Sequence, residues 1–166
     1  MKVIDIIKSD KPTLSFEVFP PKTSAKFESV KSAAERIADL KPDFMSVTYG
    51  AGGGTSDFTA TLASDLLKKG VTPITHLTCV SSNEEKIEQE LKKIKSNGIE
   101  NILALRGDIP DDLDRDEMTY HYAYELINKI KEFDDSFCIG GACYPETHPE
   151  SENSVKDNEN LKIKVQ

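Results

Sequence analysis

The sequence predicts an α/β fold with a parallel sheet, formed by a single domain over residues 1–166. Five short apolar runs recur along the chain, and each is followed by a stretch with the hydrophobic spacing of a helix. Corresponding residues of successive runs, Leu14, Phe44, Ile74, Ile102 and Ile139, are 30, 30, 28 and 37 residues apart. This spacing suits a strand–helix unit, and no hairpin signal joins neighbouring runs, so we expect the strands to be parallel.

The apolar runs define the strands in order. The expected strands are Thr13–Phe19, Phe44–Thr48, Thr72–Thr78, Asn101–Leu105 and Cys138–Cys143. A short helix over residues 2–8 is expected before the first of them.

The helices between the strands are marked by apolar residues three and four apart, within 27–37, 62–67, 87–94 and 123–130. Gly70 and Gly98 are expected to end the second and third of these helices. Ser82, with Glu85 three residues later, is expected to begin the third as a capping box. A fifth helix is expected from about Asp157 to the end of the chain.

Composition narrows the class of protein. The chain has 21 Lys and Arg against 29 Asp and Glu, a net charge of −8, which is a poor match to a nucleic-acid binder. No apolar run approaches the roughly 18 residues of a membrane span, and the first residues do not resemble a signal peptide. The three cysteines form no CxxC pair, so we expect a cytoplasmic protein.

Five strand–helix units fit two architectures, an open doubly wound sheet or part of an eight-unit barrel of about 250 residues. Chain length favours the open sheet. The chemistry at the strand ends favours the barrel, because the carboxyl ends of parallel strands meet at one edge, where ligands bind. Polar or aromatic residues fall there on every strand, namely Glu17, Thr48, His76, Arg106, Asp108, Tyr144 and His148.

Five segments, SFEVFPPKT, PDFMSVTYGAGGG, THLTC, NILALRGD and YPETHPES, resemble the methylenetetrahydrofolate reductase family in their order and spacing. The resemblance implies a flavin-dependent (βα)8, or TIM, barrel, of which this chain would form about five units without closing it. It implies hydride transfer from NADH or NADPH to FAD, and then reduction of 5,10-methylenetetrahydrofolate to 5-methyltetrahydrofolate for methionine biosynthesis. The implied partner is thus a small-molecule folate, with no nucleic acid and no membrane.

The resemblance also implies the catalytic residues. Glu17 matches the glutamate that acts as general acid while the folate imidazolidine ring opens to an iminium. Asp108 matches an aspartate near the flavin and the folate. From the residues alone, Glu17 could equally be a buried carboxylate paired with Arg106 or Lys22, and Asp108 a turn or cap residue.

Flavin contacts are implied at several loops, and Ile163 stands where the family commonly has a basic residue. From the residues alone, His76 would more often be a core histidine and Tyr144 a packing aromatic. The glycine-rich segment 50–54 is either backbone that approaches the cofactor or a turn, and no metal site is expected. The implied cofactor-binding residues are Thr48, His76, Leu105, Arg106, Gly107, Asp108, Tyr122, Ala123, Tyr144, His148, Glu150, Asp157, Asn160 and Lys164.

The family continues for three more units beyond the part matched here. We therefore expect that the chain is a piece of a longer product, a truncated relic, or a chain completed by another chain or by self-association into an oligomer. We expect weak or absent reductase activity from the 166 residues alone. The alternative function is a non-catalytic remnant or partner subunit that binds flavin or folate.

Overall fold

A computed structural model describes residues 1–49 and 56–165, so the glycine-rich segment 50–54 lies outside the described residues. The strands β1 (Ser15–Val18), β2 (Phe44–Val47), β3 (Thr72–Thr78), β4 (Asn101–Leu105) and β5 (Cys138–Gly141) form one sheet. They pair in chain order and all run parallel. A doubly wound sheet reverses its strand order, so this open sheet matches the other expectation, part of a TIM-type barrel.

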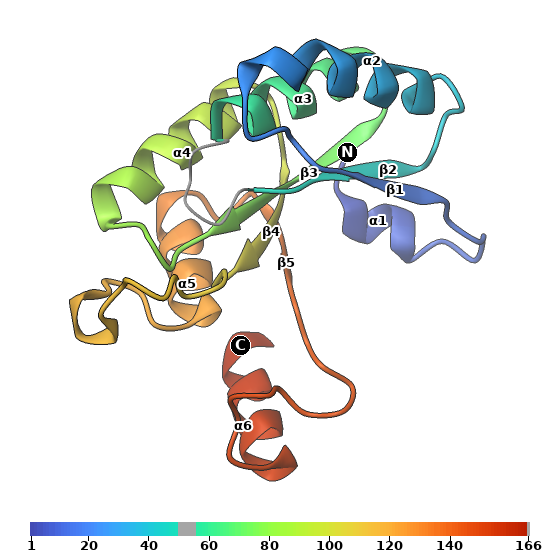
Figure 1. Cartoon of the computed structure of the whole chain (residues 1–166). Coiled ribbons are helices and arrows are strands. Elements are labelled where there is room, and N and C mark those ends of the chain that lie inside the picture. The colour runs from blue at the N-terminus through green and yellow to red at the C-terminus, as the bar shows by residue number, and fades with distance from the viewer. Residues whose placement is uncertain (50–55, 166) are drawn as a thin grey trace.

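One face of the sheet carries the core. The helices α2 (Phe27–Ala38), α3 (Ser56–Lys68), α4 (Glu84–Ser96) and α5 (Ala123–Phe133) follow the first four strands (Figure 1). Alternate strand residues such as Met45, Val47 and Leu77 are buried in one hydrophobic cluster with residues of these helices. The helices therefore cover the side of the sheet to which these alternate residues point.

The opposite side, which we call the inner face, consists of the remaining alternate residues of the strands. Glu17 is in register with Ser46, and Ser46 with Ile74. His76 is in register with Leu103, and Leu103 with Gly140. The inner face is thus partly polar on β1 to β3, and on β4 and β5 it is apolar at Leu103, Leu105 and Gly140. In a closed barrel it would line the interior.

Helix α1 (Val3–Ile7) covers the amino ends of the strands, where Asn101 holds it. The Asn101 side chain accepts a hydrogen bond from Val3 N at 2.7 Å and donates to the carbonyls of Met1 and Pro73 at 3.0 and 3.1 Å. Figure 1 shows α1 on the side of the sheet opposite α2 and α3. The carboxyl edge is left free of this helix.

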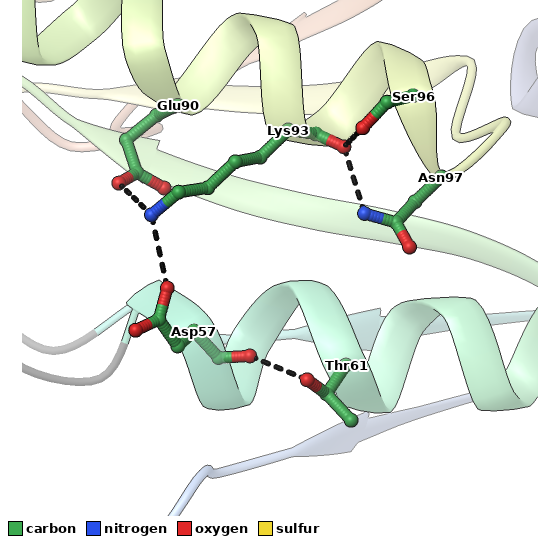
Figure 2. A network of polar contacts seen from close by, with 6 residues as sticks. All are labelled: Asp57, Thr61, Glu90, Lys93, Ser96 and Asn97. Atoms are coloured by element: carbon green, nitrogen blue, oxygen red, sulfur yellow. Dashed lines mark hydrogen bonds and ion pairs between the residues drawn. The ribbon is translucent and has the colours of Figure 1, made fainter.

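Helices α3 and α4 are joined by a polar contact as well as by the core (Figure 2). Lys93 Nζ lies 2.9 Å from Asp57 Oδ1 on α3 and 3.1 Å from Glu90 Oε1 on α4. The hydrogen bond to Asp57 is the main cause that raises the pKa of Lys93. Because Glu90 is buried, Lys93 neutralises a carboxylate that would otherwise be costly to bury.

The expected elements are confirmed with some shifts at their ends. The predicted capping box at Ser82 is wrong, because Asn83 caps α4 by accepting from Lys86 N at 2.9 Å. The last helix, α6 (Ser154–Val165), begins before Asp157, and its last turn reaches the end of β5 through Lys164 (Figure 1). The described chain also contains two short 3-10 turns, η1 (Ser24–Lys26) and η2 (Arg115–Glu117). No helix among the described residues is long and apolar enough to span a bilayer.

Candidate active site

Three side chains from neighbouring strands meet on the inner face. Ser46 Oγ on β2 donates a hydrogen bond to Glu17 Oε2 on β1 at 2.8 Å. His76 Nε2 on β3 lies 3.3 Å from the same oxygen, without the alignment of a directed hydrogen bond. Two strand-end residues from the predicted set, Glu17 and His76, therefore lie together, as parallel strands require.

The local environment of Glu17 differs from the buried carboxylate that the sequence alone allowed. Its side chain is 44% exposed, because the helices cover the face that carries Phe16 and Val18 instead. Its partner is neither Arg106 nor Lys22, and among the described residues His76 is the basic side chain within ion-pair distance. Glu17 is thus a carboxyl that a ligand on the inner face can reach.

His76 is buried, and burial is the main cause that lowers the pKa of its imidazole. The nearby Glu17 carboxylate acts in the opposite direction but does not outweigh burial. The imidazole is therefore neutral at pH 7, and a neutral ring nitrogen can accept a proton as well as donate one.

A second cluster follows β4 and β5. The Arg106 guanidinium contacts Glu150 with two nitrogens, at 2.8 and 2.6 Å, and Arg115 Nη2 lies 3.4 Å from the same carboxylate. The hydrogen bonds from Arg106 lower the pKa of Glu150 to about 2. Asp108 is exposed, and its charge helps to raise the pKa of Arg106, although less than Glu150 does. These residues form a charged rim beside the inner face.

The backbone after β4 is anchored on the backbone after β3. The Arg106 carbonyl accepts hydrogen bonds from Cys79 N at 3.2 Å and Val80 N at 2.9 Å. Gly107 has a φ of +88°, and a Cβ there would lie 3.0 Å from Val80 Cγ1 and 3.1 Å from Thr78 Cβ. Only glycine fits this position without strain or displacement.

Cys79 links this anchor to the start of α5. Its Sγ lies 3.9 Å from both the Arg106 carbonyl and the Tyr122 carbonyl. Burial raises the pKa of the thiol to about 12, so it remains protonated and acts as a weak donor. Tyr122 itself is exposed and stacks on Tyr124, with ring centroids 5.8 Å apart. Ala123 is the first residue of α5.

The YPETHPES loop is tied to α6. Tyr144 meets His148 edge to face at 4.9 Å between ring centroids, and His148 Nδ1 accepts from Glu150 N at 3.1 Å. Asp157 Oδ2 on α6 accepts from His148 N at 3.0 Å. At the other end of α6, Lys164 Nζ donates to the Ala142 carbonyl at 2.7 Å.

Most of the predicted residues fall into these contacts, but not all. Within the described residues Thr48 bonds through its backbone alone, which accepts from Thr59 Oγ1 and donates to Val18 O. Leu105 lies on the inner face by register. Asn160 is exposed and bonds to none of the other predicted residues in the described chain. Sequence reasoning missed Ser46 and Cys79. Both lie within segments that carry the family resemblance, Ser46 in PDFMSVTYGAGGG and Cys79 in THLTC, but only the structure shows what their side chains contact.

Comparison with known proteins gives one consistent family. Residues 2–166 match the family model described as methylenetetrahydrofolate reductase. A 5,10-methylenetetrahydrofolate reductase of Pectobacterium carotovorum subsp. carotovorum is 39% identical over 153 residues, which cover 92% of this chain and 50% of the relative. The 5,10-methylenetetrahydrofolate reductase of Escherichia coli (strain K12) matches to the same extent, 39% over 153 residues. Methylenetetrahydrofolate reductase (NADH) 1 of Arabidopsis thaliana is 42% identical over 159 residues, 90% of this chain and 27% of the relative. The chain thus spans about half the length of these bacterial relatives.

Proposed function

The chain belongs to the methylenetetrahydrofolate reductase family, and from that premise we propose that it forms the amino-terminal part of a flavin-dependent catalytic barrel. Residues 1–166 form one domain of five strand–helix units. The reaction is reduction of 5,10-methylenetetrahydrofolate to 5-methyltetrahydrofolate, with NADH or NADPH as the hydride source. The observation that carries this proposal is the exposed Glu17 carboxyl on the inner face, held between Ser46 and His76.

Glu17 is the general acid in this proposal. It donates a proton to the folate nitrogen while the bond between that nitrogen and the methylene carbon breaks, which leaves an iminium at the methylene carbon. The iminium carbon then accepts a hydride to become the methyl group. Glu17 suits this step because it is accessible from the inner face and because neutral His76 lies beside it to take part in proton exchange.

The residues of the apolar part of the inner face fit a flavin ring. Gly140 presents no side chain, and a Cβ there would come within 3.2 Å of Leu103 Cδ1. Leu103, Leu105 and Gly140 therefore place apolar side chains and bare backbone next to His76, with the Arg106 cation after the end of β4. When bound, FAD would supply the hydride-transfer chemistry that protein side chains lack.

The remaining cofactor contacts are proposed for the charged rim and for the polar and aromatic residues near it. Arg106 has guanidinium protons beyond the two that contact Glu150, so it can bind an anionic group without losing that ion pair. The other proposed contacts are Thr48, His76, Gly107, Asp108, Tyr122, Ala123, Tyr144, His148, Glu150, Asp157, Asn160 and Lys164. Three free cysteines suit a reducing cytoplasm, where this reaction would supply methyl groups for methionine biosynthesis.

The test uses the purified chain with FAD added under anaerobic conditions. We expect flavin fluorescence to be quenched on binding, NADH or NADPH to bleach the flavin, and methylenetetrahydrofolate to restore its colour slowly. Glu17→Gln should keep the bleaching and lose the reoxidation by folate. Glu28→Gln, which removes the same charge from the exposed side of α2, is the matched control and should keep both. A chain that binds no flavin refutes the proposal, and binding without bleaching indicates a non-catalytic remnant.

A further inference from the structure

Among the residues that the structure describes, the Ser46 side chain makes one hydrogen bond, and its acceptor is the proposed acid. The residue is the Cα partner of Glu17 in the parallel pair β1–β2, so both side chains leave the sheet on the inner face. Its hydroxyl donates to Glu17 Oε2 at 2.8 Å. No described residue competes for the hydroxyl proton, and the hydrogen bond is therefore set by the strand register itself.

The contacts of Glu17 are unequal between its two oxygens. Ser46 and His76 both approach Oε2, and no described residue donates to Oε1. His76, from β3, is the one described titratable group within ion-pair distance, and its imidazole is neutral. The orientation of the carboxyl group thus depends on short-range hydrogen bonding rather than on a fixed charge.

From this asymmetry we propose that Ser46 is a positioning residue for Glu17, which holds Oε2 and leaves Oε1 to pass the proton to the substrate. The proposal rests on the proposed function, in which Glu17 is the acid. A hydrogen bond to one carboxylate oxygen fixes the rotation of the group about its last side-chain bond. A reacting group held in this way loses less freedom in the transition state.

The role of Ser46 is separable from the packing of its strand. Met45 and Val47, on either side of it, are fully buried in the core and provide the hydrophobic contacts of β2. Ser46 is half-buried on the uncovered face. Replacing its hydroxyl by hydrogen should therefore leave the fold intact.

The experiment compares Ser46→Ala with Ser46→Thr, which keeps a hydroxyl on the same carbon. Ser15→Ala is the matched control, because Ser15 lies on the same face of β1 two residues before Glu17 and makes no side-chain hydrogen bond in the described chain. The first readout is the 13C resonance of the Glu17 carboxyl carbon at neutral pH in glutamate-labelled chain. The second is the rate at which methylenetetrahydrofolate reoxidises the reduced flavin.

We expect the Glu17 resonance to move in Ser46→Ala and to stay in place in Ser46→Thr and Ser15→Ala. Flavin reoxidation by folate should slow about 10- to 100-fold in Ser46→Ala, with bleaching by the nicotinamide unchanged and with recovery in Ser46→Thr. An unmoved resonance in Ser46→Ala, or reoxidation at the wild-type rate, overturns the positioning role. A wild-type chain whose bound flavin is not bleached by the nicotinamide contradicts the proposed function instead, and the carboxyl resonance still decides whether Ser46 orients Glu17.

Discussion

Replacing Gly107 by alanine tests whether the turn after β4 is anchored as described. The substitution places a side chain on a backbone with φ of +88°, which costs roughly 1–2 kcal/mol for an L-residue. The new Cβ would also lie 3.0 Å from Val80 Cγ1 and 3.1 Å from Thr78 Cβ. Overpacking of this kind adds roughly 1–3 kcal/mol, so we expect a total loss of about 2–5 kcal/mol in the free energy of unfolding.

Gly70→Ala is the matched control for this measurement. Gly70 has a similar φ of +81°, but a Cβ there meets nothing within 4 Å. Backbone strain and the lower entropy of the unfolded chain are therefore common to both variants, and the difference between them isolates the contact with residues 78–80. Urea unfolding of the two variants, followed by circular dichroism, gives that difference. Equal destabilisation by Gly107→Ala and Gly70→Ala would refute the anchoring of this turn.

Three further outcomes are expected. The pKa of Glu150 is lowered from 4.5 to about 2, so the stability that its ionised form contributes should be present above pH 4.5 and lost as the pH falls toward about 2. The melting temperatures of wild type and Glu150→Gln should therefore differ at neutral pH and converge over that range. A difference that stays constant with pH would contradict the lowered pKa. Burial raises the pKa of the Cys79 thiol to about 12, so this thiol should not react in the folded chain. A thiol reagent at pH 8 should therefore modify the exposed Cys143 in the folded chain and Cys79 only after unfolding, and peptide mass spectrometry would show which cysteine is modified. Lys93→Met leaves the buried Glu90 carboxylate without its cation (Figure 2), and it should lower the free energy of unfolding by about 1–3 kcal/mol. Lys92→Met, at an exposed position, is the control and should change the midpoint of urea unfolding little.

The strands were predictable because a parallel strand concentrates apolar residues. The third and fourth strands match their predicted ranges, and the others lose only residues at their ends. The same signal left the environment of Glu17 open, because an apolar run alone allows both a buried carboxylate and one on an uncovered face. The alternation of β1 decides between the two: Phe16 and Val18 enter the core while Glu17 points to the uncovered face.

The polar contacts of the site were less accessible to sequence reasoning. Ser46 sits in a strand whose pattern gives no reason to prefer it over any other serine, and it becomes informative only when the register places it opposite Glu17. The N-cap of α4 shows a similar limit, because Ser82 and Asn83 are both good capping residues. The local turn decided between them, since Ser82 N bonds back to the Cys79 carbonyl and Asn83 is the next residue.

The cluster of Glu17, Ser46 and His76 and the charged rim of Arg106 and Glu150 are held in place by different contacts. A substitution that loosens one of them should therefore not loosen the other to the same degree. Glu17, Ser46 and His76 are placed by strands that pair along most of their length. Arg106 lies beyond β4 and is placed by the hydrogen bonds that its carbonyl accepts from the backbone after β3. Glu150 is in turn held by Arg106, whereas the loop that carries it is also tied to α6 through His148 and Asp157. Loosening the turn at Gly107 should therefore disturb the charged rim while Glu17, Ser46 and His76 stay in place, because none of the hydrogen bonds and ion pairs described for these three residues involves that turn.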